Sequence, residues 1–267
     1  MNRVILVCAA LLFSVAAAAA DDPQTGRFWV MAGGFWPDVD TTVRVDGNGG
    51  RVGTQVDFES DLGLDERDAL FIGGAGMRIG ERHYLDLLYF KLARSGEHTI
   101  DIDIDFNDQT FSRQTTLNSF FDTEVIRFSY GYAFISNDKH VLTGQIGAHY
   151  TRISAGLRLA GNTASVTEDA SSDVPLPVLG LAYNYRITPA VRLDLRAQVF
   201  RLSVEDVDGA LNNISASLQY AFTPRIAAFV GYNYYTLDLD SKSDHWNGSF
   251  DFGYKGPWLG VTAGFGD

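Results

Sequence analysis

The chain has 267 residues, of which 33 are Asp or Glu and 21 are Lys or Arg, so its formal net charge is −12 with histidine neutral. This acidic balance argues against nucleic acid as a partner, because phosphate binding requires a basic surface. The single cysteine, Cys8, lies near the N-terminus. The rest of the chain can therefore form neither a disulfide nor a thiol site.

Residues 1–20 predict a secretory signal peptide. Arg3 supplies a positive start, residues 4–15 form an apolar run, and residues 16–20 are small residues typical of a cleavage zone. We expect cleavage after Ala20, which leaves 21–267 as one large β domain. A lipoprotein interpretation of Cys8 is the alternative, although Cys8 comes too early to follow a full apolar stretch. Beyond residue 20, no apolar run approaches the roughly twenty residues that a membrane-spanning helix requires.

Strict alternation of apolar and polar residues marks the remainder of the chain. The clearest example is the hairpin over 177–199, whose turn is Thr188-Pro189-Ala190. In its second arm one set of residues is apolar and the interleaved set is polar: Val191, Leu193, Leu195, Ala197 and Val199 against Arg192, Asp194, Arg196 and Gln198. A period of two places these sets on opposite faces of a strand.

Ten segments carry this pattern and predict an all-β chain. In chain order they are 26–36, 69–79, 84–93, 122–134, 142–151, 177–187, 191–199, 213–222, 226–239 and 250–265, with the third expected to continue over 100–106. The connections at 80–83, 136–139, 188–190 and 223–225 are short, and the others are long and polar. Arms of about ten residues joined in this way are typical of a transmembrane antiparallel up-and-down β-barrel, apolar toward lipid and polar toward the lumen.

Strand number and orientation follow from the connections. Ten strands, with eight as the alternative, place both termini on the side of the short turns, which these barrels keep in the periplasm. Aromatic residues near the strand ends, among them Trp29 and Trp258, are expected to form interfacial girdles. Near 256–257 the apolar set changes phase, and we expect a β-bulge there.

The signal peptide, the alternating arms, the turn 188–190 and the closing strand 259–265 together resemble small bacterial outer-membrane β-barrels. The resemblance covers the whole mature chain at the level of pattern. It implies export to the outer membrane of a Gram-negative bacterium, with outer-membrane lipid, lipopolysaccharide and the barrel assembly machinery as partners. We expect a monomer without a cofactor.

Inward-facing charges are the first candidate site. The predicted lumen network consists of Arg78, Asp86, Arg127, Arg186, Arg192, Asp194 and Arg196. Charges in a confined lumen need partners or water, which favours a salt-bridged plug with Asp194 as the central acceptor. A narrow channel that favours anions is the alternative.

Acidic residues of one loop and of one strand face are candidate metal ligands. They are Asp57, Glu59, Asp61, Asp101, Asp103 and Asp105. Closely spaced carboxylates can hold Ca²⁺, but the spacing over 57–65 does not match a calcium loop. Alternating Asp and Ile over 100–105 is equally expected of a strand that extends above the membrane.

A barrel enzyme, either a protease or a lipid-modifying enzyme, is the third candidate. His149 and Thr151 share one face of a strand, but the sequence identifies no acidic partner for them. We therefore expect a non-enzymatic surface or envelope protein with acidic extracellular loops and a largely plugged lumen.

Overall fold

The computed structural model describes residues 26–46, 52–67, 69–106, 109–159, 168–204, 207–243 and 246–266. The predicted signal peptide lies outside these residues. Strands make up nearly all of the described chain, and the described residues contain no helix long and apolar enough to cross a membrane. The strands are β1 (Phe28–Phe35), β2 (Asp38–Val45), β3 (Gln55–Asp57), β4 (Leu70–Ile79), β5 (His83–Thr99), β6 (Ile104–Phe106), β7 (Gln109–Phe111), β8 (Thr116–Ser136), β9 (His140–Leu159), β10 (Glu168–Arg186), β11 (Val191–Val204), β12 (Val207–Thr223), β13 (Ile226–Ser243) and β14 (Trp246–Phe265).

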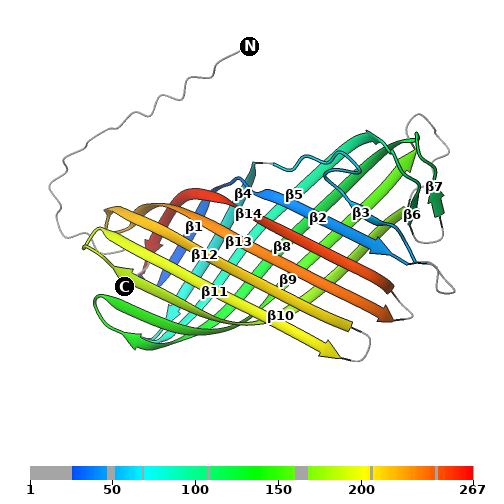
Figure 1. Ribbon diagram of the computed structural model, residues 1–267. Coiled ribbons are helices and arrows are strands. Elements are labelled where there is room, and N and C mark those ends of the chain that lie inside the picture. The colour runs from blue at the N-terminus through cyan, green and yellow to red at the C-terminus, as the bar shows by residue number, and fades with distance from the viewer. Residues whose placement is uncertain are drawn as a thin grey trace, which may run out of the picture.

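Ten strands form a closed antiparallel barrel, as predicted. They pair in the order β1, β4, β5, β8, β9, β10, β11, β12, β13, β14, and β1 pairs again with β14. Figure 1 shows these strands running steeply tilted around one axis, with the C-terminus at the end of the barrel opposite β6 and β7. We call the part of the barrel next to the short turns the turn half, and the part next to the long connections the loop half.

Three of the four short turns use the same hydrogen bond. The side-chain oxygens of Asn137, Thr188 and Thr223 each accept the backbone N–H three residues later, at 2.9, 3.0 and 3.0 Å. This side-chain mimic of a turn ends one strand and starts the next within a few residues. The fourth turn contains Gly80, whose φ of 63° is readily available only to glycine.

The first barrel strand is interrupted, and its two parts share one partner. β1 pairs with residues 258–265 of β14, and β2 pairs with residues 248–255. Between them, Trp36 N donates to Pro257 O at 3.1 Å. The bulge expected at 256–257 is wrong: β14 runs unbroken from Trp246 to Phe265, and the irregularity lies in its partner at Trp36 and Pro37.

The strands are longer than predicted because they continue beyond the belt of lipid-facing residues. β8 has 21 residues and β9 has 20. The expected extension over 100–106 is instead a separate hairpin, in which β6 pairs with β7. Strand β10 begins at Glu168, inside what the sequence predicts as a loop.

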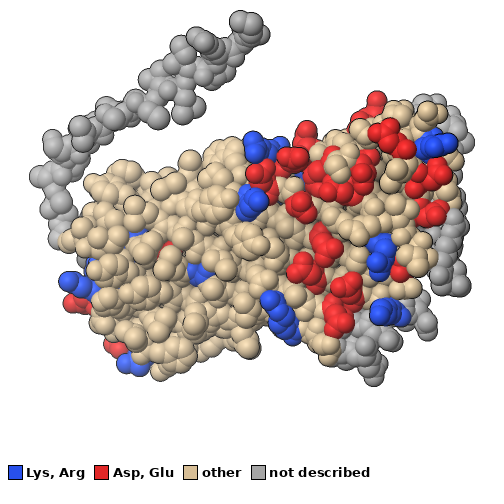
Figure 2. All heavy atoms as spheres, viewed as in Figure 1, with Lys and Arg blue, Asp and Glu red and all other residues tan. Residues whose placement is uncertain are grey.

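Apolar side chains face outward around the turn half. They include Val30, Phe71, Leu87, Phe128, Ile146, Leu179, Leu181, Leu195, Ile214, Leu218, Val230, Leu259 and Val261, each at least 38% exposed. Such a belt is unfavourable in water and favourable in lipid, so this half of the barrel is the membrane-spanning part. Figure 2 shows it as a largely uncharged band, with a few charged side chains at the turn end.

In the loop half the apolar side chains face inward. They form one buried cluster that includes Phe35, Phe58, Leu62, Leu64, Phe90, Leu92, Phe121, Val125, Tyr235, Leu237, Phe250, Phe252 and Tyr254. Acidic residues cover the outside of the same half (Figure 2). Along β14 the inward positions remain the even-numbered residues throughout, so the apolar set changes face while the strand keeps its register.

A charged cavity in the lumen as candidate functional site

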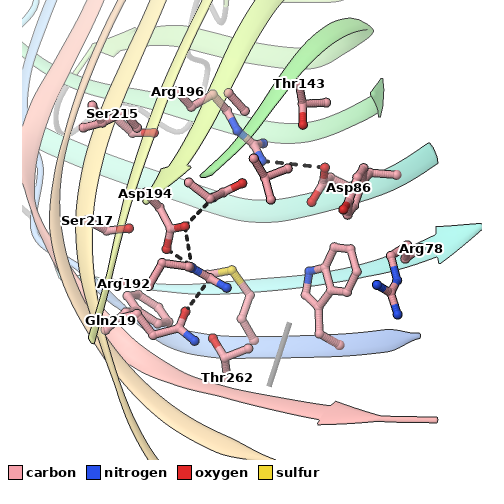
Figure 3. Close-up of a pocket in the computed structure, with 18 of the residues that line it drawn as sticks. Arg78, Asp86, Thr143, Arg192, Asp194, Arg196, Ser215, Ser217, Gln219 and Thr262 are labelled. Carbon is pink, nitrogen blue, oxygen red and sulfur yellow. Dashed lines mark hydrogen bonds and ion pairs between the residues drawn. The ribbon is translucent and has the colours of Figure 1, made fainter. Parts of the chain in front are cut away.

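A cavity of about 540 Å³ occupies the lumen of the turn half. The turn residues Glu81, Asn137 and Lys139 line its mouth, which places the opening at the short-turn end of the barrel. All seven charged residues predicted for the lumen line this cavity: Arg78, Asp86, Arg127, Arg186, Arg192, Asp194 and Arg196. Figure 3 shows several of them projecting from the barrel wall toward one another.

Asp194 is the best-satisfied acid of the cavity. Arg192 lies two residues away on the same face of β11 and binds it through two nitrogens, with Nε 2.7 Å from Oδ1 and Nη2 3.1 Å from Oδ2. Asn184, the register partner of Asp194 on β10, also donates to it. Arg192 Nη2 donates further to Gln219 Oε1 at 2.9 Å on β12. Asp194 therefore accepts from one arginine and one amide, rather than sitting between arginines as the plug hypothesis expects.

A second ion pair crosses the lumen. Arg196 Nη2 of β11 lies 3.6 Å from Asp86 Oδ2 of β5 (Figure 3). Arg127 of β8 lines the same cavity. Among the described residues, no group accepts a hydrogen bond from Arg127 Nε or from Arg196 Nη1, although both atoms are buried. The cavity therefore holds guanidinium groups with unused donor capacity.

One wall of the cavity is apolar, and sequence reasoning missed it. Trp29, Trp258 and Phe229 line the cavity from β1, β14 and β13. Trp29 is only 6% exposed, so the expectation that Trp29 and Trp258 belong to a lipid-facing girdle is wrong. Alternation along the strand could have predicted the inward position of Trp29. Trp29 lies between two lipid-facing residues, and successive side chains of a strand point to opposite faces.

Each tryptophan rests on a glycine of the neighbouring strand. Trp29 is the register partner of Gly76, and a Cβ at Gly76 would lie 2.2 Å from the indole ring. Trp258 is the register partner of Gly231, where a Cβ would lie 2.4 Å from the indole Nε1. Only glycine leaves room for these rings to lie against the barrel wall.

A layer of polar side chains lies beyond the cavity toward the loop half. Gln198 is fully buried and lies farther along β11 from the turn than Arg196. Its amide nitrogen donates to Ser129 Oγ at 3.0 Å across the lumen, and its amide oxygen accepts from Asn213 at 3.3 Å. His149 Nε2 lies 3.1 Å from the same oxygen. Gln198 thereby links three other strands at the point where the apolar core begins.

His149 makes contacts that hold it in place. Besides Gln198, its ring stacks on Tyr235 with the centroids 6.0 Å apart. Thr151 is also buried on the same face of β9. In the described part of the chain, neither residue has a carboxylate among the partners found for it. In the described residues, the partners of His149 are thus an amide and an aromatic ring.

Glu59, a candidate metal ligand, has structural partners instead. It forms an ion pair with Arg94 and accepts from Thr41 N at 2.8 Å. Arg94 in turn donates to Thr41 Oγ1 at 2.6 Å and lies over the ring of Phe121. Glu59 thus secures the segment after β3 to the inside of the barrel.

Three of the other candidate ligands accept from backbone N–H groups, and a fourth accepts from a side-chain hydroxyl. Asp57 Oδ1 accepts from Ser60 N at 2.7 Å, and Asp61 Oδ2 accepts from Asp57 N at 2.9 Å. Asp103 Oδ1 accepts from Arg113 N at 2.7 Å, Asp105 Oδ1 accepts from Thr110 at 2.5 Å, and Asp101 is exposed. Within the described ranges, no group of three His, Cys, Asp or Glu residues could hold a metal ion.

Comparison with known proteins identifies the architecture. No protein-family model matches this sequence, and neither does any curated protein sequence. In structure, the chain is similar to the outer-membrane protease OmpT from Escherichia coli, with a TM-score of 0.58 and 10% identity over 89% of this chain and 96% of that one. The chain has the fold of bacterial outer-membrane β-barrels.

Autotransporter units are more distant outer-membrane barrels. The translocator domain of NalP from Neisseria meningitidis has a TM-score of 0.48 and 13% identity, covering 90% of this chain and 89% of that one. The transport unit of AIDA-I from Escherichia coli has a TM-score of 0.46 and 9% identity, covering 90% of each chain. Identities this low concern the fold alone, so the function of this barrel has to be argued from its own residues.

Proposed function

We propose that the protein is a non-enzymatic component of the bacterial outer membrane: a barrel closed in its loop half, which carries an acidic surface outside the cell. The observation that carries this proposal is the apolar core inside the loop half. A conducting barrel needs a polar path from one end to the other. Here the path from the turn side meets buried aromatic rings.

The closure is built from packed rings and from the segment that follows β3. Tyr235 and Tyr254 stack with centroids 4.6 Å apart and planes 6° apart. Phe121 lies 5.6 Å from the ring of Phe58 in an edge-to-face contact. Phe58 belongs to the segment that crosses the barrel interior, and Leu62 from the same segment is fully buried. These buried rings support a barrel that is closed to hydrated solutes.

Turn length and charge support the orientation. Short turns lie on the periplasmic side of such barrels, which would place both termini there. The loop half would then stand in the external medium, where its acidic exterior is solvated. Export by the predicted signal peptide, insertion by the barrel assembly machinery and contact with lipopolysaccharide belong to the same proposal, as does a monomeric state.

Conductance in a planar bilayer tests the closure. We expect the wild-type barrel to give no steady current, with circular dichroism of the same preparation in vesicles confirming that the protein is folded. As the positive arm, a Phe58→Ser, Leu62→Ser double variant should produce current, because water enters the interior where the rings no longer seal it. The matched control is Phe71→Ser with Ile79→Ser, two exposed positions of β4, which should remain silent.

Reproducible anion-selective conductance from the wild-type barrel would overturn the closed barrel and favour the narrow channel. The channel has one specific observation in its support, which is the excess of basic over acidic residues around the cavity. Proteolytic or lipid-modifying activity that depends on His149 would contradict the non-enzymatic assignment.

A further inference from the structure

We propose that the turn-side cavity is a binding site for a small organic anion, whose carboxylate or phosphate contacts Arg127 and Arg196 while its apolar body lies against Trp29 and Trp258. This site goes beyond the closed barrel proposed above, since it concerns the opposite half of the lumen. The binding and conductance experiments can therefore fail separately.

Size and access fit a small ligand. The cavity of about 540 Å³ falls within the range of about 300–1,000 Å³ that is usual for small-molecule sites. Its mouth lies at the turns, and the buried Gln198 layer lies beyond it toward the loop half. A ligand would enter and leave by the same opening, which suits binding rather than passage.

The sign of the charge fits an anion. Six basic and four acidic side chains line the cavity. Two of the acids are already neutralised within the wall, Asp194 by Arg192 and Asp86 by Arg196. When these two ion pairs are set aside, basic side chains still outnumber acidic side chains around the cavity. The net charge of the lining is therefore positive.

Unused donors point to the position of the anionic group. Arg127 and Arg196 both line the cavity, and Arg196 lies 3.6 Å from Asp86. The buried Nε of Arg127 and Nη1 of Arg196 find no acceptor in the described part of the chain. A guanidinium presents its donors in a fixed plane that matches the oxygens of a carboxylate or phosphate. An anion that binds both guanidinium groups would supply the acceptor that these donors lack, once a small side-chain shift turns the donors toward the cavity.

The opposite wall fits an apolar body. Trp29 and Trp258 lie against glycine positions, and Met31 also lines the cavity. Trp258 Nε1 is a further buried donor without an acceptor among the described residues. Most small-molecule sites combine apolar walls with a few polar groups that fix orientation, and this cavity has both parts. The chemistry is that of an amphipathic anion, not of an inorganic ion alone.

Isothermal titration calorimetry on the folded barrel in detergent micelles tests the site. The probes are phenyl phosphate and benzoate, with benzyl alcohol as the neutral analogue. We expect saturable binding of at least one anion and none of the alcohol. A stronger response to one anion identifies phosphate or carboxylate as the preferred group, and either result supports the site.

Variants locate the anion within the cavity. Arg127→Gln should weaken binding about tenfold or more, because a charge-assisted hydrogen bond is lost. The matched control is Arg152→Gln on the outside of β9, where the arginine pairs with Glu124, and it should bind as the wild type does. If Arg127→Gln does not fold, Trp258→Phe provides the second test: the change in tryptophan fluorescence that binding causes should be smaller than in the wild type, with Trp29 as the remaining indole beside the ligand. An unchanged fluorescence response would contradict the contact with Trp258.

Absence of saturable binding by the wild type at millimolar probe concentrations would overturn the proposal. So would equal affinity for the anions and benzyl alcohol, or equal loss of affinity in Arg127→Gln and Arg152→Gln.

Discussion

The two halves of the barrel place their apolar side chains on opposite faces of the same strands. On β14, Leu259 and Val261 of the turn half point outward and are 51% and 54% exposed, whereas Phe250 and Phe252 of the loop half point inward and are 7% and 2% exposed. The strand pairs without a register shift along its whole length. The difference shows that the medium around each half decides which face of the strand is apolar. The pleat of the strand by itself only places alternate side chains on two opposite faces.

The physical reason lies in what each face would otherwise contact. Lipid solvates apolar side chains but not charges, so in the turn half the charges are directed into a wet lumen. Water surrounds the loop half, and there the apolar side chains reduce their exposure by filling the interior. The loop half is thus packed like a water-soluble β-barrel on top of a membrane barrel.

Truncation of an interior ring in the loop half should have the largest effect. Phe121→Ala is expected to cost about 3–5 kcal/mol of unfolding free energy, because it leaves a cavity among fully buried rings. Phe128→Ala, on the same strand in the turn half, should cost clearly less, since lipid chains can occupy the space that the ring leaves. Folding titrations into lipid vesicles measure both values. Equal losses would show that the loop-half core contributes no more than the belt.

A charge in the belt should have the next largest effect. Leu195→Arg is expected to cost about 2–4 kcal/mol if the residue lies near the bilayer midplane, because lipid cannot solvate the guanidinium. Ser203→Arg lies on the same face of β11 in the loop half, beside Asp208, and should change stability by less than about 1 kcal/mol. The same titrations separate the two variants. A comparable cost at both positions would mean that the membrane boundary does not fall between them.

Removal of the lumen acid should have an intermediate effect. Asp194→Ala is expected to cost about 1–3 kcal/mol, because it leaves Arg192 and Asn184 without their acceptor, while the side chain is 21% exposed and water can partly compensate. Asp238→Ala, on the exterior of the loop half, should stay within about 0.5 kcal/mol of the wild type. A loss at Asp238 as large as that at Asp194 would show that lumen and surface carboxylates are equally important.

The smallest expected effect is a gain in stability on the acidic exterior. Burial raises the pKa of Asp251, and the nearby carboxylates of Asp238, Asp240 and Asp40 raise it further, while Arg44 acts in the opposite direction. A carboxyl with a raised pKa in the folded state favours folding when protonated, and this contribution is lost as the pH rises through that pKa. Asp251→Asn should therefore stabilise the protein at pH 7 by about 0.2–0.5 kcal/mol, a value reduced for solvent screening.

Stability measured against pH checks the sign. The advantage of Asp251→Asn should shrink as the pH falls and the wild-type carboxyl becomes protonated. Asp101→Asn, at another exposed acid, serves as the control and should show no such gain. A destabilised Asp251→Asn variant at pH 7 would contradict the repulsion on which the prediction rests.

Strand number and facing were predictable because alternation with a period of two is a local property. Val191 to Val199 already specifies which side chains share a face, and the turn at 188–190 aligns Asp194 with Asn184. The seven lumen charges could be named for the same reason. Their pairing could not, because the contact of Arg196 with Asp86 joins strands that are far apart in the sequence.

The sequence by itself determined the barrel, its ten strands and the inward position of the charges, since each follows from alternation and turn length along the chain. Only the tertiary structure decided that the lumen is divided into a charged cavity and an apolar core. That division depends on contacts across the barrel, such as Phe58 against Phe121 and Trp29 against Gly76. It also explains the change of phase at 256–257, which in the linear sequence resembles a bulge but marks the place where the strand passes from one medium into another.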